Sequence, residues 1–215
     1  MSAAYVLNIS STISGLLPVL AALFNYKSLD KVLRIAGLFF LVSSVFDWML
    51  ELTKIAAFGM HNNHPLLHLF TMISILFFAA IYYHAFFDPG LKRIALILSG
   101  IALLIVIFNS IFIEGIWEYP SISATVLSIL LICFSLAYFY QLLNRQEFIH
   151  IEKQGLFWIN AGILFYFSIN IFLFMLFNSL IKAHQEDSYM IHIITNIIAN
   201  ILYSVGLLCK PQKTA

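Results

Sequence analysis

Apolar stretches and short polar connectors alternate along the whole chain. Seven stretches hold about 20 predominantly apolar residues, the length that a helix needs to cross the hydrocarbon core of a bilayer. The pattern predicts transmembrane helices over residues 3–26, 35–54, 66–87, 94–113, 122–143, 156–177 and 190–208. The connectors are too short to hold a soluble domain. We therefore expect residues 1–215 to form a single domain, an all-α integral membrane bundle of seven helices.

Features at the helix ends carry their own predictions. Asp88-Pro89-Gly90 has the residues of a turn between the third and fourth helices. Glu114–Pro120 is a polar connector that we expect to be solvated and anchored at the membrane interface by its aromatic residues. Tyr82, near the end of the third helix, stands where aromatic belt residues meet the membrane–water boundary.

The composition disfavours several classes of protein. The chain is 62% hydrophobic and only 10% charged, whereas soluble domains are about 45–50% apolar and about 25% charged. A soluble enzyme, a nucleic-acid-binding protein and a disordered regulator all need more charge than this chain has. The net charge of +1 indicates no polyanionic partner. The lipid bilayer is the expected environment.

Lysine and arginine are distributed unequally between the two sets of connectors. One set carries nine of them: Lys27, Lys31, Arg34, Lys92, Arg93, Arg145, Lys153, Lys210 and Lys213. The other set carries only Lys54 and Lys182. Because short cytoplasmic loops are enriched in basic residues, the N-terminus is predicted outside and the C-terminus in the cytoplasm. An odd number of helices agrees with this orientation.

A faint internal repeat relates the two halves of the sequence. Residues Ala36–Phe40 resemble Ala161–Phe165, and Leu67–Thr71 resemble Ile191–Thr195, at nearly equal offsets. A 3+1+3 arrangement, with two parallel groups of three helices joined by the fourth, would keep both halves in one orientation. Parallel repeats are common in transporters, although chance similarity between apolar helices explains the likeness equally well.

Polar residues inside the spans mark the candidate site, because ionisable groups within a membrane normally face the bundle interior or a water-filled cavity. The second helix carries Asp47 and Glu51, and the third carries His64 and His68; each pair shares a helical face. The seventh helix carries a polar stripe at the same four-residue spacing: Ser188, His192, Asn196, Asn200 and Ser204.

Depth estimates place the ionisable groups in one outer layer. From Arg34, the chain reaches Asp47 after a rise of roughly 20 Å, about two thirds of the hydrocarbon core. His68 and His192 lie roughly 6 Å below the outer boundary. We predict that the second, third and seventh helices adjoin. At least one carboxylate is then expected within hydrogen-bonding or one-water reach of His68 or His192.

Three hypotheses for this layer stay open at the level of sequence. In the first, the polar residues form a hydrogen-bonded network that fixes helix packing. In the second, they form a ligand-binding or proton-sensing pocket that is open to the outside, built from Asp47, Glu51, His68, His192, Asn196 and Asn200. In the third, they hold zinc or haem, with ligands drawn from His64, His68, His192, Asp47 and Glu51.

Three further runs of residues resemble a known group of sequences. They are His61–His68, Phe157–Ser168 and Asn196–Tyr203. The runs look like those of uncharacterised bacterial seven-helix proteins, which are similar to the membrane portion of seven-transmembrane receptors with intracellular signalling modules. The resemblance implies an inner-membrane location and a separate cytoplasmic signalling partner. It brings no catalytic residues.

The sequence therefore favours a membrane sensor or receptor-like protein with an outward-facing polar pocket for an unidentified small molecule or proton. The leading alternative is a small-solute or proton-coupled transporter, which would require polar residues toward the inner end as well. The third reading is a metal- or haem-dependent membrane enzyme, for which the sequence identifies no nucleophile.

Overall fold

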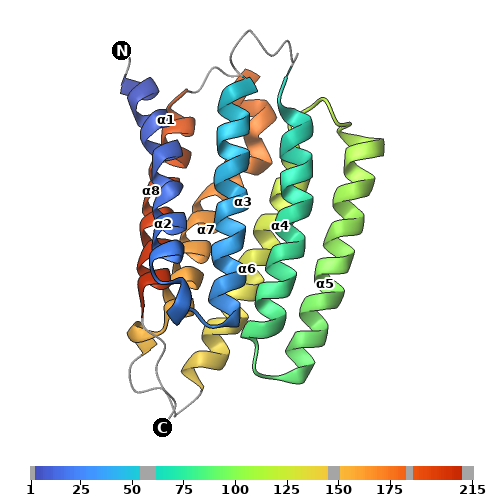
Figure 1. The fold of residues 1–215 in the computed structure, drawn as a ribbon. Coiled ribbons are helices and arrows are strands. Elements are labelled where there is room, and N and C mark those ends of the chain that lie inside the picture. Colours follow the sequence, from blue (N-terminus) through green and yellow to red (C-terminus); the bar gives the residue numbers. More distant parts are fainter. Residues whose placement is uncertain (1–2, 54–61, 145–150, 183–185, 210–215) are drawn as a thin grey trace.

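A computed structural model describes residues 3–53, 62–144, 151–182 and 186–209, and within these ranges it contains helices and no β-strand (Figure 1). The α-helices are α1 (Ala3–Ser14), α2 (Leu16–Phe24), α3 (Lys31–Thr53), α4 (His64–Ala85), α5 (Pro89–Phe108), α6 (Ser121–Leu143), α7 (Gly155–Lys182) and α8 (Glu186–Leu208). In the described part of the chain, seven helical segments are long and apolar enough to cross a membrane, the first of them made of α1 and α2. The chain thus has the make-up of an integral membrane protein.

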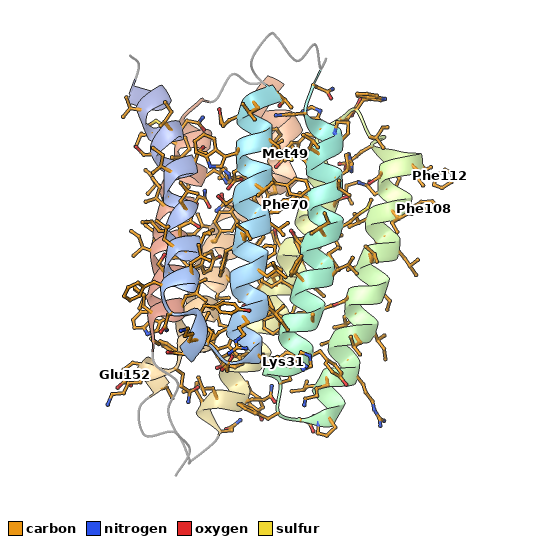
Figure 2. The ribbon with its side chains drawn as sticks, in the orientation of Figure 1. Lys31, Met49, Phe70, Phe108, Phe112 and Glu152 are labelled. Atoms are coloured by element: carbon orange, nitrogen blue, oxygen red, sulfur yellow. The ribbon has the colours of Figure 1, made fainter. Side chains whose placement is uncertain are left out.

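The helices pack side by side in one bundle (Figure 1). Helix α8 makes its main contacts with α7, α2 and α1, while α3 packs against α2 and α4. Helix α5 lies at the edge, where it contacts α4 and α6. Phe108 at the end of α5 and Phe112 in the turn that follows it point away from the bundle (Figure 2).

The two ends of the bundle differ in charge. Lys31 and Glu152 lie at one end and Met49 toward the other (Figure 2). Helices α3, α5 and α7 begin at the end that carries Lys31 and Glu152. Four basic residues lie close to these starts: Lys27, Lys31, Arg34 and Lys92. We call this end of the bundle the basic end and the opposite end the distal end. Lys54, Arg145, Lys210 and Lys213 are outside the described residues, and both the orientation in a membrane and the repeat stay predictions.

Two helices begin earlier than predicted because acidic side chains cap them. Helix α3 starts at Lys31 rather than residue 35, since Asp30 accepts a hydrogen bond from the Leu33 N–H at 2.8 Å. Helix α5 starts at Pro89 rather than residue 94. Asp88 accepts from the Leu91 N–H at 3.0 Å, and proline suits the first turn. The reading of Asp88-Pro89-Gly90 as a turn was therefore wrong.

The first span is broken, although one continuous helix was predicted. Gly15 separates α1 from α2, and Pro18 cannot donate a hydrogen bond back to the Ser14 carbonyl. The fourth span also changes form, because residues Asn109–Ile113 make a π-helical turn after α5. Such turns are rare and frequently mark functional sites.

Small residues allow two helices to approach closely along the last third of the chain. The backbones of α7 and α8 meet at Gly155 and Gly206. Two turns further along α7, a Cβ at Gly162 would lie 2.6 Å from the Tyr203 ring. Small-residue contacts of this kind are typical of helices that pack within membranes.

Tyr82 corrects another expectation. It is fully buried in the core rather than placed in an interfacial belt. Its hydroxyl donates to Oδ1 of Asn160 at 2.7 Å and lies 2.8 Å from the Ser135 hydroxyl. Three helices, α4, α6 and α7, are thereby joined by one satisfied polar group toward the basic end.

Candidate functional site

Two histidines near the start of α4 hold the connector between α5 and α6. His64 Nδ1 lies 2.8 Å from the carbonyl oxygen of Trp117, and His68 Nε2 lies 3.1 Å from that of Glu118. A carbonyl can only accept, so both ring nitrogens must donate. His64 and His68, four residues apart on one helix face, thus donate hydrogen bonds to successive backbone carbonyls of the connector. We call this arrangement the histidine clamp.

The second nitrogen of His68 meets a hydroxyl that suits either charge state of the ring. Ser110 Oγ lies 2.7 Å from His68 Nδ1 and 2.8 Å from the Val106 carbonyl. A neutral ring accepts the Ser110 proton, whereas an imidazolium donates to Ser110 and turns the hydroxyl toward Val106. Rotation of one hydroxyl therefore keeps the buried imidazole, 3% exposed, hydrogen-bonded in both states.

Part of the connector folds onto the bundle, while Ile116, Trp117 and Glu118 stay exposed, as expected of a solvated loop. Glu114 accepts from Asn109 Nδ2 at 2.6 Å and from the Ile122 N–H in the first turn of α6 at 2.9 Å. Gly115 turns the chain with a φ of 73°, which favours glycine. Tyr119 stacks on Phe177 of α7 with ring centroids 3.7 Å apart. The connector caps the distal end across α4, α6 and α7.

A second polar group joins α1 to its neighbours. Asn8 donates to Glu51 of α3 at 3.0 Å. Ser11 and Ser14 of α1 accept from the α8 amides of Asn196 and Asn200, both at 2.9 Å. We call these contacts the α1 junction. They fix the distal half of the first span by side-chain hydrogen bonds to α3 and α8.

Asp47 stands beside the break in the first span. One of its carboxylate oxygens would lie 3.4 Å from a Cβ placed on Gly15, which is ordinary van der Waals contact and places Asp47 next to the break. Asp47 and Glu51 share a face of α3, and electrostatic repulsion from Glu51 acts on Asp47. Both acidic side chains predicted for the site therefore face the α1 junction.

His192 belongs to a third group, between α7 and α8. Its Nδ1 donates to Oδ1 of the buried Asn170 at 2.9 Å. Asn170 in turn donates to the Tyr166 carbonyl and to Thr195 Oγ1, both at 2.8 Å, which fixes the orientation of its amide. The imidazole also lies against the rings of Tyr166 and Phe174.

The structure divides the residues that were expected to form one cluster. Helices α3 and α4 do adjoin, but α8 packs mainly on α7, α2 and α1. Both nitrogens of His68 bond to Ser110 and Glu118, so the ring makes no direct hydrogen bond to Asp47 or Glu51. Most of these polar side chains have their hydrogen-bond partners on an adjacent helix, because hydrogen bonds inside a membrane form between groups that are already packed together.

The metal hypothesis receives no support from the described residues. Within them, no three histidine, cysteine, aspartate or glutamate side chains lie close enough to hold a metal ion. His64 uses Nδ1, and His68 uses both nitrogens, to bind protein oxygens and a hydroxyl. A metal bound by His68 would have to displace its contact with Glu118 or with Ser110.

Sequence reasoning missed several residues that complete these groups. Asn8, Ser11 and Ser14 recur every three residues along the first apolar stretch, a spacing that could have marked the polar face of α1. Ser110 gave no comparable signal, because its role depends on the π-helical turn. The carbonyls of Trp117 and Glu118 are backbone groups, which residue types do not reveal.

Comparison with known proteins adds no assignment: no family model, no curated protein and no solved structure matches the chain.

Proposed function

We propose that this chain is a membrane sensor or receptor-like protein with an outward-facing polar pocket, and that it signals through a separate cytoplasmic partner. One observation carries the proposal: the distal half of the first span, α1, is a separate helix that polar side chains attach to α3 and α8. The responsive residues are Asp47, Glu51, His68, His192, Asn196 and Asn200.

The chemistry of the α1 junction suits a moving element. Water or a ligand can replace a side-chain hydrogen bond at small net cost, about 1 kcal/mol for a typical one. A change of charge on Glu51 or Asp47 alters the contact with Asn8 or the fit beside Gly15. Because the span is interrupted at Gly15 and Pro18, α1 can move while α2 stays packed on α3 and α8.

A transporter is the alternative that one feature favours, because broken spans commonly form transport sites. A transporter also needs a polar route to the basic end. In the described residues, Tyr82, Ser135 and Asn160 satisfy one another there, amid apolar side chains such as Leu131 and Leu207. This closed inner half supports sensing over transport.

Protons are the first stimulus to test, because an unperturbed imidazole titrates near pH 6.5. Trp48 lies beside Asp47 on α3 and is 45% exposed, so its fluorescence reports on the distal end once Trp117 and Trp158 are replaced by Phe. In reconstituted protein we expect a reversible emission change as the pH is lowered from 7 to 4, and its loss in His192→Asn. Asparagine keeps hydrogen-bonding capacity but cannot titrate.

Two results would contradict this assignment. A wild-type signal that stays flat across pH excludes proton sensing, and a signal that persists unchanged in His192→Asn excludes His192 as the sensor. Vesicles that load a pH-sensitive dye provide the third measurement: proton flux that depends on the protein would favour the transporter. An absorption spectrum and metal analysis of the purified protein test the haem and zinc readings directly.

A further inference from the structure

An apolar groove runs between α2 and α8 on the outside of the bundle. It is a shallow, open hollow of about 640 Å³, lined by Leu17, Leu20, Leu23 and Phe24 of α2 and by Ile201, Val205 and Leu208 of α8, over a floor of Ala21 and Ser204. The small floor residues explain the hollow. Ser204 donates its hydroxyl to the Asn200 carbonyl at 2.6 Å, so the floor offers no free donor.

The groove faces the hydrocarbon of the bilayer, because both helices lie within membrane-spanning segments. Leu20 and Phe24 on its rim are 60% and 89% exposed. A water-filled groove with such a lining would be unfavourable, whereas an acyl chain gains contact with apolar atoms along it. Its volume lies within the range of about 300–1,000 Å³ typical of small-molecule sites.

The groove ends among cationic side chains at the basic end. Phe24 and Leu208 are the last residues of their helices, and Asn25 ties the two ends together by donating to the Leu207 carbonyl at 2.9 Å. Immediately beyond, the Arg34 guanidinium lies 5.2 Å from the centre of the Tyr26 ring. Its Nε donates to the Leu29 carbonyl at 2.9 Å, which holds the guanidinium in place.

We propose that the α2–α8 groove binds one anionic phospholipid, with an acyl chain in the groove and the phosphate held by Arg34 and Lys27. Both side chains are exposed; Lys27 follows Phe24 by three residues, and Arg34 contacts Tyr26. Arginine suits phosphate because its planar donors fit two oxygens. The predicted orientation places this end at the cytoplasmic leaflet, where anionic lipids are enriched. This inference is independent of the proposed sensing function.

A second copy of the chain fits the groove less well than a lipid. In a two-fold symmetric pair within one membrane, the groove ends of both copies would meet at the same depth. Lys27, Lys31 and Arg34 of each copy would then be brought together, and like charges near one another are unfavourable. A negatively charged headgroup complements the same residues.

Native mass spectrometry of the detergent-purified protein tests the proposal with phosphatidylglycerol and phosphatidylcholine of identical acyl chains. We expect preferential retention of one phosphatidylglycerol. The double variant Lys27→Gln with Arg34→Gln should lose this preference by on the order of 20-fold, because each cation contributes about 1 kcal/mol near an anionic surface. The matched control is Lys92→Gln with Arg93→Gln, which removes two cations near the start of α5, away from the groove.

The acyl chain is tested separately. Ser204→Phe fills the floor of the groove and should weaken binding of both lipids. In Trp-free protein, Leu20→Trp on the groove rim should be quenched more strongly by brominated phosphatidylglycerol than by brominated phosphatidylcholine. Leu104→Trp on α5, at a position of similar exposure, should be quenched equally by both. The fluorescence measurement stands even if Ser204→Phe fails to fold.

Three outcomes would overturn the proposal. Equal retention of the two lipids removes the headgroup preference. Equal losses in the two double variants show that any cation at this end suffices. A dimer that Ser204→Phe or Leu20→Trp disrupts identifies a second copy of the chain as the occupant.

Discussion

His68 and His192 occupy matching positions in the faint sequence repeat, yet they have different surroundings. His68 is buried and joins α4 to backbone and hydroxyl groups of the fourth span and the following connector. His192 is half-buried and joins α8 to an amide of α7. One histidine fastens a connector, and the other fastens a pair of helices.

The difference lies in how closely the flanking helices approach. Helices α7 and α8 pack along a long interface in which His192 reaches Asn170 directly, and the glycine contacts of that interface lie toward the basic end. Near His68, α4 faces the edge helix α5, whose π-helical turn brings Ser110 to the imidazole. A close helix pair lets a side chain reach its neighbour directly, whereas a wider contact leaves room for a folded connector.

The prediction with the largest expected effect concerns the side of the membrane on which both histidines lie, because a reporter fusion is active on one side and inactive on the other. Reporter fusions within Glu114–Pro120 should be active only outside, and fusions after Ala215 only in the cytoplasm, because basic residues collect at the opposite end from the histidine clamp. A fusion after Asp88 serves as a second cytoplasmic reference. Opposite labelling would reverse the orientation and place both histidines inside.

The glycine contacts between α7 and α8 should be the region least tolerant of added volume. Gly162→Leu must displace the Tyr203 ring, and we expect destabilisation by about 1–3 kcal/mol or more. Gly100→Leu on α5 is the matched control, because nothing lies within 4 Å of an added Cβ there. Thermal unfolding in detergent measures both. Equal unfolding temperatures for the two variants would refute the packing contrast.

Leucine substitutions separate the roles of the two histidines. His68→Leu leaves the Glu118 carbonyl without its donor, and His192→Leu leaves the Asn170 carbonyl oxygen without its donor; each should cost roughly 1–3 kcal/mol. Only His68→Leu should also speed proteolysis within residues 114–120. His68→Gln, which retains an amide donor, is the control. Faster cleavage in His192→Leu instead would contradict the assignment of His68 to the connector.

The smallest effect concerns the turn that brings the connector back to the histidine clamp. Gly115→Ala should destabilise by about 1 kcal/mol, because a Cβ is unfavourable at a φ of 73°. No atom lies within 4 Å of the added Cβ, so conformation alone is changed. Gly100→Ala gives the reference for a helical glycine. A melting temperature at or above that of the wild type in Gly115→Ala would show that the turn is not strained.

The number and approximate position of the spans followed from sequence, because the length of an apolar stretch is a local property that the bilayer thickness selects. The polar side chains of α3, α4 and α8 were also recognisable, since ionisable and amide residues stand out in apolar stretches. The predicted starting residues of the helices were less accurate than the predicted spans. The caps at Asp30 and Asp88 extend helices into segments that residue type alone assigned to connectors.

Only the tertiary structure decided which polar groups meet. His68 bonds to Ser110, 42 residues away, and to a backbone carbonyl of Glu118. The order of packing places α8 against α1 and α7, and so gives Asn196 a partner on α1 and His192 a partner on α7. Helical spacing tells which residues share a face, but the identity of the facing helix depends on how all seven spans pack.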